Sequence, residues 1–147
     1  MANLCEFGSS LEATRAWIDE LMAILQTDES HACRAFRVVG HELRDQLTTE
    51  EAADLAAQLP LLLRGVFFEG WRPNGKPASR SKKDFLENVA ESYKEISNKK
   101  QIESIVRDFF RFLDRKVSPG EIRDIVTGLP KQLRDLWPEY SGDRRSA

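Results

Sequence analysis

The chain of 147 residues has few of the side chains from which metal sites and disulfide networks are built. It contains two histidines, His31 and His41, and two cysteines, Cys5 and Cys33. One possible cysteine pair, in a chain without an export signal, indicates two reduced thiols. His31 and Cys33 would lie about 200° apart around a helix, too far to share one ion. We therefore expect no metal and no cofactor.

Long hydrophobic runs are also missing. No apolar stretch approaches the roughly 20 residues that a membrane helix needs, and residues 1–10 lack the basic and apolar regions of a signal peptide. With 41% hydrophobic and 31% charged residues, the chain can instead bury a core in water. We expect a cytoplasmic protein of one domain, or of two small domains pressed together, without membrane association.

Lysine is absent from the first half of the chain, and all eight lysines lie from Lys76 onward. Residues 1–70 carry twelve carboxylates and five arginines, a net charge of −7, whereas residues 71–147 carry twelve carboxylates and seventeen bases, a net charge of +5. Two explanations are open. The oppositely charged halves attract each other within the fold, or the basic half binds an acidic partner, including the acidic half of a second copy.

A loose internal repeat is the most informative pattern that is present. Residues 29–69 match residues 99–139 at a constant shift of 70 positions. The matched pairs include Arg37 with Arg107, Leu43 with Leu113, Glu51 with Glu121, Leu59-Pro60 with Leu129-Pro130, and Leu63-Arg64 with Leu133-Arg134. Such self-similarity is typical of a duplicated unit. We predict an all-α fold of about eight helices, in two related four-helix halves packed as one compact protein.

Capping residues and apolar stripes place the helices of each half. Capping-box spacing occurs in Ser9 with Glu12, Thr48 with Glu51, Ser81 with Asp84, and Ser118 with Glu121. We predict a first helix over 11–26, a second starting near Asp28 or Glu29, and short fourth helices over 61–68 and 132–137, after Pro60 and Pro130. The predicted organisation is an acidic unit over 1–70, a basic Pro/Gly linker over 71–83, a basic unit over 84–140 and a disordered tail over 141–147.

Several segments of the chain are similar to those of a known family. They are 43–48, 51–52, 56–60, 64–65, 68–73, 117–121, 129–130 and 133–137. The most distinctive are Gln58-Leu59-Pro60 and Glu69-Gly70-Trp71-Arg72-Pro73. These segments resemble the bacterial family catalogued as domain of unknown function 2267. The resemblance covers about 17–137 and implies a small, all-helical bacterial or archaeal protein of duplicated design. It supplies no catalytic residue and no cofactor.

Catalytic patterns find little support. Residues 70–77 nearly match the phosphate-binding loop G-x-x-x-x-G-K-[ST], but Pro77 stands where the hydroxyl is needed and a predicted helix precedes the segment. The charged residues Asp54 and Arg64 recur as Asp124 and Arg134. Because surroundings usually make a catalytic pair unequal, this repetition favours two structural ion pairs, Asp54–Arg64 and Asp124–Arg134. We do not expect an enzyme.

The joint between the two halves is the place where they differ most. It combines aromatic and basic side chains: Phe67, Phe68, Trp71, Arg72, Lys76, Arg80, Lys82 and Lys83. One explanation is that the aromatic rings seal the joint and the bases are merely solvated. The other is that the joint binds a partner, because arginine and tryptophan dominate interface hot spots.

From these patterns we expect a non-catalytic protein-interaction or scaffold module, with an unknown protein or a second copy as its partner. The alternative is a nucleic-acid-binding regulatory protein that uses its basic second half. The overall net charge of −2 argues against that alternative, because duplex binding gains most of its strength from phosphate neutralisation.

Overall fold

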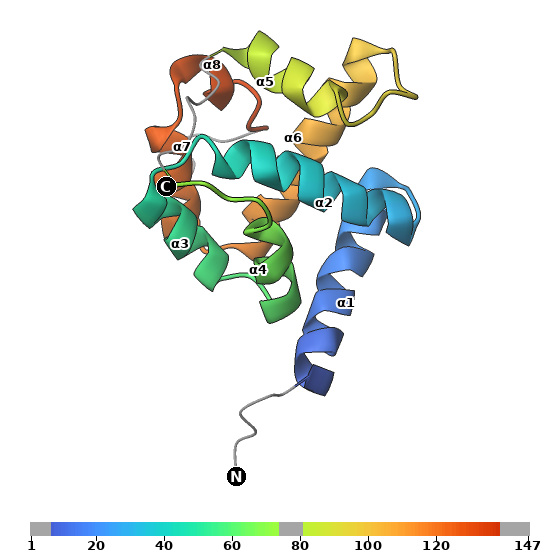
Figure 1. Ribbon diagram of the computed structural model, residues 1–147, viewed down its shortest axis with the longest axis vertical. Helices are drawn as coiled ribbons and strands as arrows, with labels where there is room; N and C mark the ends of the chain where they lie inside the picture. The colour runs from blue at the N-terminus through green and yellow to red at the C-terminus, as the bar shows by residue number, and fades with distance from the viewer. Residues whose placement is uncertain (1–6, 74–80, 139–147) are drawn as a thin grey trace.

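The computed structural model describes residues 7–73 and 81–138, and these residues form eight helices without a strand (Figure 1). The helices are α1 (Phe7–Leu25), α2 (Glu29–Arg44), α3 (Thr49–Ala57), α4 (Leu61–Phe67), α5 (Lys82–Ala90), α6 (Lys99–Lys116), α7 (Pro119–Gly128) and α8 (Lys131–Arg134). The all-α prediction is confirmed. The predicted tail over 141–147 lies outside the described residues.

Side-chain caps fix most of the helix starts. Asp28, Thr48, Ser81 and Ser118 each accept a hydrogen bond from a backbone N–H in the first turn of the next helix. Thr48 and Glu51 form a complete capping box. The prediction for Ser9 was wrong, because α1 already includes Phe7 and Ser9 lies inside it.

Helices α2 and α6 cross at the centre of the molecule, and the others pack around them (Figure 1). Helix α1 packs against α2, α4 and α6, α5 packs against α2, α6 and α8, and α3 packs against α7. One contiguous cluster of buried side chains draws on all eight helices. The first four helices and the last four therefore share a single core.

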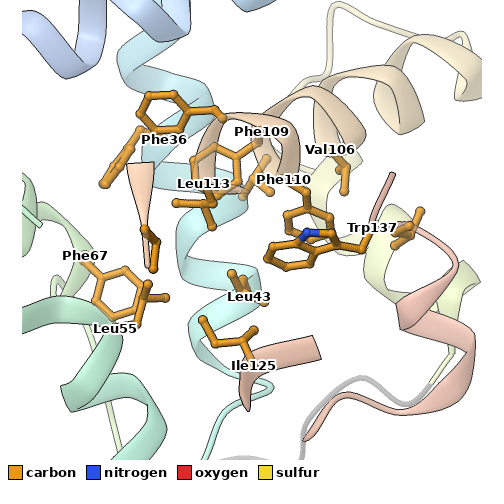
Figure 2. Close-up of a cluster of buried hydrophobic side chains, with 14 of the residues drawn as sticks. Phe36, Leu43, Leu55, Phe67, Val106, Phe109, Phe110, Leu113, Ile125 and Trp137 are labelled. Atoms are coloured by element: carbon orange, nitrogen blue, oxygen red, sulfur yellow. The ribbon is translucent and has the colours of Figure 1, made fainter. Parts of the chain in front are cut away.

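Aromatic rings of α6 lie at the middle of this core, as Figure 2 shows. Phe110 stacks on Trp137 with ring centroids 4.4 Å apart, and Phe109 meets Phe36 edge to face at 5.7 Å. Phe112 lies off the main apolar stripe of α6, yet it is fully buried because it meets Trp17 of α1. A second face of α6 is therefore covered by α1.

The last helix is shorter than the predicted 132–137, because the chain tightens after Arg134. The N–H groups of Leu136 and Trp137 donate to carbonyls three residues back, those of Leu133 and Arg134. Leu136 and Trp137 are both buried, and the Trp137 ring stacks on Phe110.

We predict that Gly40→Ala stabilises the protein. An added Cβ in this buried turn of α2 would lie 3.8 Å from Cζ of Phe109 and 4.0 Å from Cδ1 of Phe67, which is ordinary van der Waals contact. Alanine also has the higher helix propensity, so we expect a gain of about 0.5–1 kcal/mol and a rise in Tm of roughly 2–3 °C. Thermal unfolding followed by circular dichroism measures both.

Gly128→Ala is the matched control for this prediction. A Cβ at Gly128 in α7 would lie 2.8 Å from Oε2 of Glu51, which closes the Thr48 capping box. That contact forces the Glu51 carboxylate to move and offsets the gain in helix propensity. A lower Tm for Gly40→Ala than for the unchanged protein would contradict the space for a methyl group beside Phe109 and Phe67.

Candidate interaction site

The aromatic part of the joint belongs mainly to the core. Phe67 is only 3% exposed, so its predicted role at a binding surface is corrected: it is a core residue. Its ring centroid lies 5.4 Å from that of Phe68, which lies 4.9 Å from that of Trp71. Phe68 and Trp71 are half-buried and pack against the core, whereas Arg72 is exposed. The three rings, which we call the aromatic ladder, thus lead from the core to the surface.

The basic part of the joint lies on a different group of helices. Lys82 pairs with Glu103 of α6 at 3.5 Å, and its backbone N–H donates to Gln132 of α8. Lys83 is exposed. Lys76 and Arg80 lie outside the described residues. The predicted joint is therefore divided between the aromatic ladder at the end of α4 and basic residues at the start of α5.

Arg44, which is 4% exposed, connects α2 to the end of α4. Its guanidinium donates to the carbonyl oxygens of Phe67 at 2.9 Å and Glu69 at 2.7 Å, and its Nε donates to Asp45 at 3.0 Å. These carbonyls belong to a helix end that lacks further intrahelical donors. Sequence reasoning missed this role, because nothing in the local pattern of α2 marks Arg44 as buried.

His41 is half-buried and lies on the same helix as Arg44. Its Nε2 lies 2.7 Å from the carbonyl oxygen of Val66. Burial lowers the pKa of His41, because desolvation disfavours the charged imidazolium. His41 therefore also supports the packing of α2 on α4.

The predicted ion pairs of Arg64 and Arg134 are replaced by hydrogen bonds to the backbone. Arg64 donates to the carbonyl oxygens of Ala56, Ala57 and Leu59, at 3.0, 3.5 and 3.0 Å. Arg134 donates to those of Thr127 and Leu129, both at 3.0 Å. Asp54 and Asp124 are exposed, and among the described residues neither forms an ion pair with these arginines. Each arginine thus caps the end of the preceding helix.

Polar contacts join the acidic and basic halves. Lys116 of α6 pairs with Glu20 of α1 at 3.4 Å, and Arg34 of α2 pairs with Glu95. The Arg34 guanidinium also lies 4.4 Å from the ring centroid of Tyr93. The Lys116–Glu20 pair therefore uses part of the opposite charge within the fold, whereas in the Arg34–Glu95 pair the acidic half supplies the base.

Carboxylates gather where α3 meets α7. The Ser118 N–H donates to Oε1 of Gln58 at 2.8 Å. In the predicted capping box, the Glu121 carboxylate would accept this hydrogen bond; here a glutamine of the other half accepts it.

Burial raises the pKa of Glu121, and the carboxylates of Asp54, Asp124 and Glu51 raise it further. The ionised form of Glu121 is therefore disfavoured in the folded protein.

We predict that Glu121→Gln stabilises the protein at pH 7 by about 0.5 kcal/mol. Because the folded pKa of Glu121 is raised, the wild type loses stability as the pH rises from the ordinary glutamate pKa through the folded value. Below both values the carboxyl is protonated in both states, so the advantage of an uncharged amide at this position disappears. Urea unfolding at pH 7 and at pH 3 measures this difference.

Glu50→Gln is the matched control, because Glu50 also lies in the first turn of its helix but is exposed. Loss of a carboxylate from a helix N-terminus is slightly destabilising. If the Glu121→Gln protein were less stable at pH 7 than the wild type, the raised pKa of Glu121 would be wrong.

A cleft of about 330 Å³ lies between α5, the turn after it and the start of α6. Its aliphatic side chains are those of Leu86, Ala90, Ile96 and Ile102. Its charged side chains are those of Lys83, Lys99, Lys100, Glu87 and Glu103. We call this feature the lysine-rimmed cleft. Lys83, one of the predicted partner-binding residues, lines this cleft.

The charge of the lysine-rimmed cleft is not balanced internally. Glu103 is held by Arg107 at 2.7 Å and by Lys82 at 3.5 Å, and the Arg107 hydrogen bond in particular lowers the pKa of Glu103. Lys83, Lys99 and Lys100 form no ion pair with another described residue and are exposed. The cleft therefore has an aliphatic floor beneath a rim of net positive charge.

Large apolar side chains are exposed on two of the helices, α1 and α4. Among the described residues, the exposed large hydrophobic side chains are Phe7 and Leu11 of α1 and Leu61 and Leu62 of α4. Phe7 is 67% exposed and Leu11 is 58% exposed. The first turns of α1 extend beyond the other helices in Figure 1, and α1 packs against α4. We call Phe7 and Leu11 the α1 tip.

The eight helices, the single core and these two surfaces define a small all-helical protein. None of the helices in the described ranges combines the length and the apolar character that crossing a bilayer requires. Residues 14–136 match the family model described as uncharacterized conserved protein DUF2267, so the chain belongs to this family. No curated protein matches the chain.

Proposed function

We propose that the protein is a non-catalytic protein-interaction module that binds an acidic partner segment carrying apolar side chains. The observation that carries this proposal is the lysine-rimmed cleft, in which three lysines without an ion pair in the described chain surround an aliphatic floor. Apolar anchors in such clefts supply binding energy, whereas complementary charges at the rim supply specificity and speed of encounter. An acidic, amphipathic segment provides both.

The position of two lysines strengthens the preference for an acidic partner. Lys99 and Lys100 lie in the first turn of α6, whose cap is Asn98 and which has no acidic residue in that turn. The positive end of the helix dipole disfavours lysines at this place. A carboxylate of a partner would relieve this repulsion.

Nucleic acid remains the alternative ligand, because the same lysines could contact phosphates. The floor of the cleft favours protein, however. Single-stranded nucleic acid gains much of its affinity from bases that stack on aromatic rings, and this floor consists of Leu86, Ala90, Ile96 and Ile102. Such a surface fits leucine or phenylalanine side chains better than bases.

The duplicated origin of the fold is part of this proposal. It is supported by hydrogen bonds that recur at a shift of 70 residues, from Arg64 to the Leu59 carbonyl and from Arg134 to the Leu129 carbonyl. Thr48 and Ser118 likewise cap equivalent helices. Features present in both halves are then structural. The acidic half also has a cleft, between α1 and the start of α2, but its lining includes no lysine. The lysine rim, which only the basic half carries, is therefore the functional difference.

The proposal is tested by fluorescence anisotropy with three labelled probes: an acidic leucine-containing peptide, its lysine-substituted counterpart and a single-stranded oligothymidylate. We expect the acidic peptide to bind and the other two not to bind at physiological salt. Lys99→Glu with Lys100→Glu should weaken peptide binding by more than about tenfold. Arg123→Glu with Lys131→Glu, which changes exposed bases of the same half outside the cleft, is the matched control. Binding of the oligothymidylate alone would favour the nucleic-acid alternative.

A further inference from the structure

Two surfaces that no other described residue covers lie at opposite ends of the molecule's long axis. The α1 tip lies at one end, and α5 with the start of α6 lies at the other (Figure 1). The α1 tip belongs to the acidic half, and the lysine-rimmed cleft belongs to the basic half. One molecule therefore cannot bring its own tip into its own cleft without unfolding.

We propose that the segment bound by the lysine-rimmed cleft is the α1 tip of a second copy of the chain. This inference rests on the proposed function and names the partner. Phe7 and Leu11 are one helical turn apart on the same face of α1. Leu11 also lines the open cleft between α1 and the start of α2. Phe7 and Leu11 are both exposed, so together they form a small apolar patch on the surface of the described residues.

The charges of the two surfaces are complementary. Glu12 follows Leu11 directly, is exposed and forms no ion pair with another described residue. Arg15, the base nearest to Glu12 on α1, is already engaged by Glu29 at 2.6 Å and by Asp19 at 3.8 Å. Among the described residues, the tip therefore presents a carboxylate without an ion pair beside its apolar side chains, and the cleft presents three lysines without an ion pair against one exposed carboxylate, that of Glu87.

The size of the cleft fits this occupant. A volume of about 330 Å³ is at the lower end of the range for ligand sites, which suits a pair of inserted side chains.

The contact is heterologous, because a tip on one copy meets a cleft on the next. Each added copy leaves one free tip and one free cleft, so association continues into chains unless the rotation closes a ring. A small interface of this kind is weak and depends on concentration and salt.

Two variants and their mixture test the inference by sedimentation velocity over a range of concentrations. The tip variant is Phe7→Ser with Leu11→Ser, and the cleft variant is Lys99→Glu with Lys100→Glu; all four residues are exposed, so folding is preserved. The wild type should form species larger than dimers as its concentration rises. Each variant alone should remain monomeric. Their mixture should form a one-to-one dimer and nothing larger, because only one intact tip and one intact cleft remain to meet.

Three results would overturn the inference: a wild type that stays monomeric at the highest concentration, a variant that associates like the wild type, or a mixture that stays monomeric. The peptide titration separates this failure from that of the proposed function. A monomeric wild type whose cleft still binds the acidic peptide would leave the interaction module in place with a different acidic partner. Equal peptide affinity for the wild type and the cleft variant would remove the proposed function itself.

Discussion

Replacing Phe67 by alanine is expected to lower the free energy of unfolding by about 4 kcal/mol, because it empties a buried aromatic site. Phe67 is 3% exposed and borders the small space between Gly40 of α2 and Phe109 of α6. For a chain of this length the loss corresponds to a fall in Tm of roughly 12 °C. Calorimetry at neutral pH measures it.

Phe68→Ala is the matched control, since Phe68 is the next ring of the aromatic ladder but is only half-buried. We expect a loss of about 1–2 kcal/mol there. Equal effects at the two positions would mean that Phe67 is not the core residue described. Loss of peptide binding on Phe68→Ala or Trp71→Ala, without loss of stability, would instead restore the aromatic ladder as a binding surface.

Arg44→Ala is expected to cost about 3 kcal/mol, or roughly 9 °C in Tm. The substitution leaves the carbonyl oxygens of Phe67 and Glu69 without their buried donor and removes the contact with Asp45. Because two of the three acceptors are backbone atoms at the end of α4, the loss should loosen α4 from α2. Hydrogen exchange of the amides in α4 should therefore accelerate more than that in α7.

Arg37→Ala tests whether the burial of Arg44 causes this effect. Arg37 lies on the same helix and pairs with Glu69 at 2.7 Å, but its side chain is 48% exposed. Exposed ion pairs contribute about 0.2–1 kcal/mol. If Arg37→Ala destabilised the protein as much as Arg44→Ala, the distinction between buried and exposed arginines would be wrong.

Local signals in the sequence were enough to place most of the helices. The caps at Asp28, Thr48, Ser81 and Ser118 start helices where predicted, because capping depends on residues only two or three positions apart. Ser9 has the same spacing but lies within α1. A capping pattern favours a helix start but does not prevent a helix that began earlier from continuing through it.

Burial caused by packing between distant helices could not be predicted in this way. Helix α2 is surrounded by α1, α4, α5 and α6, so Arg44 and Glu42 are buried although they lie beside its apolar stripe. Glu42 accepts a hydrogen bond at 2.8 Å from Asn88 of α5, 46 positions away. The acceptors of Arg64 differ from the predicted Asp54 carboxylate for another reason. The Arg64 guanidinium meets the backbone carbonyl oxygens of Ala56 and Leu59, at the end of α3, before it can reach Asp54.

The lysine-rimmed cleft was only partly predictable. Lys83 was singled out from the density of bases near the joint, but Lys99 and Lys100 were not, because they are separated from it by all of α5. The packing of α5 on α6 brings the three lysines to one cleft. The contrast in charge between the halves was the sequence signal that pointed to this part of the molecule.

If an acidic, apolar segment binds at the lysine-rimmed cleft, the bound surface can be located by nuclear magnetic resonance. Backbone amide shifts of the ¹⁵N-labelled protein should be recorded as the acidic leucine-containing peptide is added. We expect the largest shift changes between Lys83 and Glu103, around the cleft. Shifts concentrated on the aromatic ladder at Phe68 and Trp71, or the absence of any shift at saturating peptide, would contradict binding at this cleft.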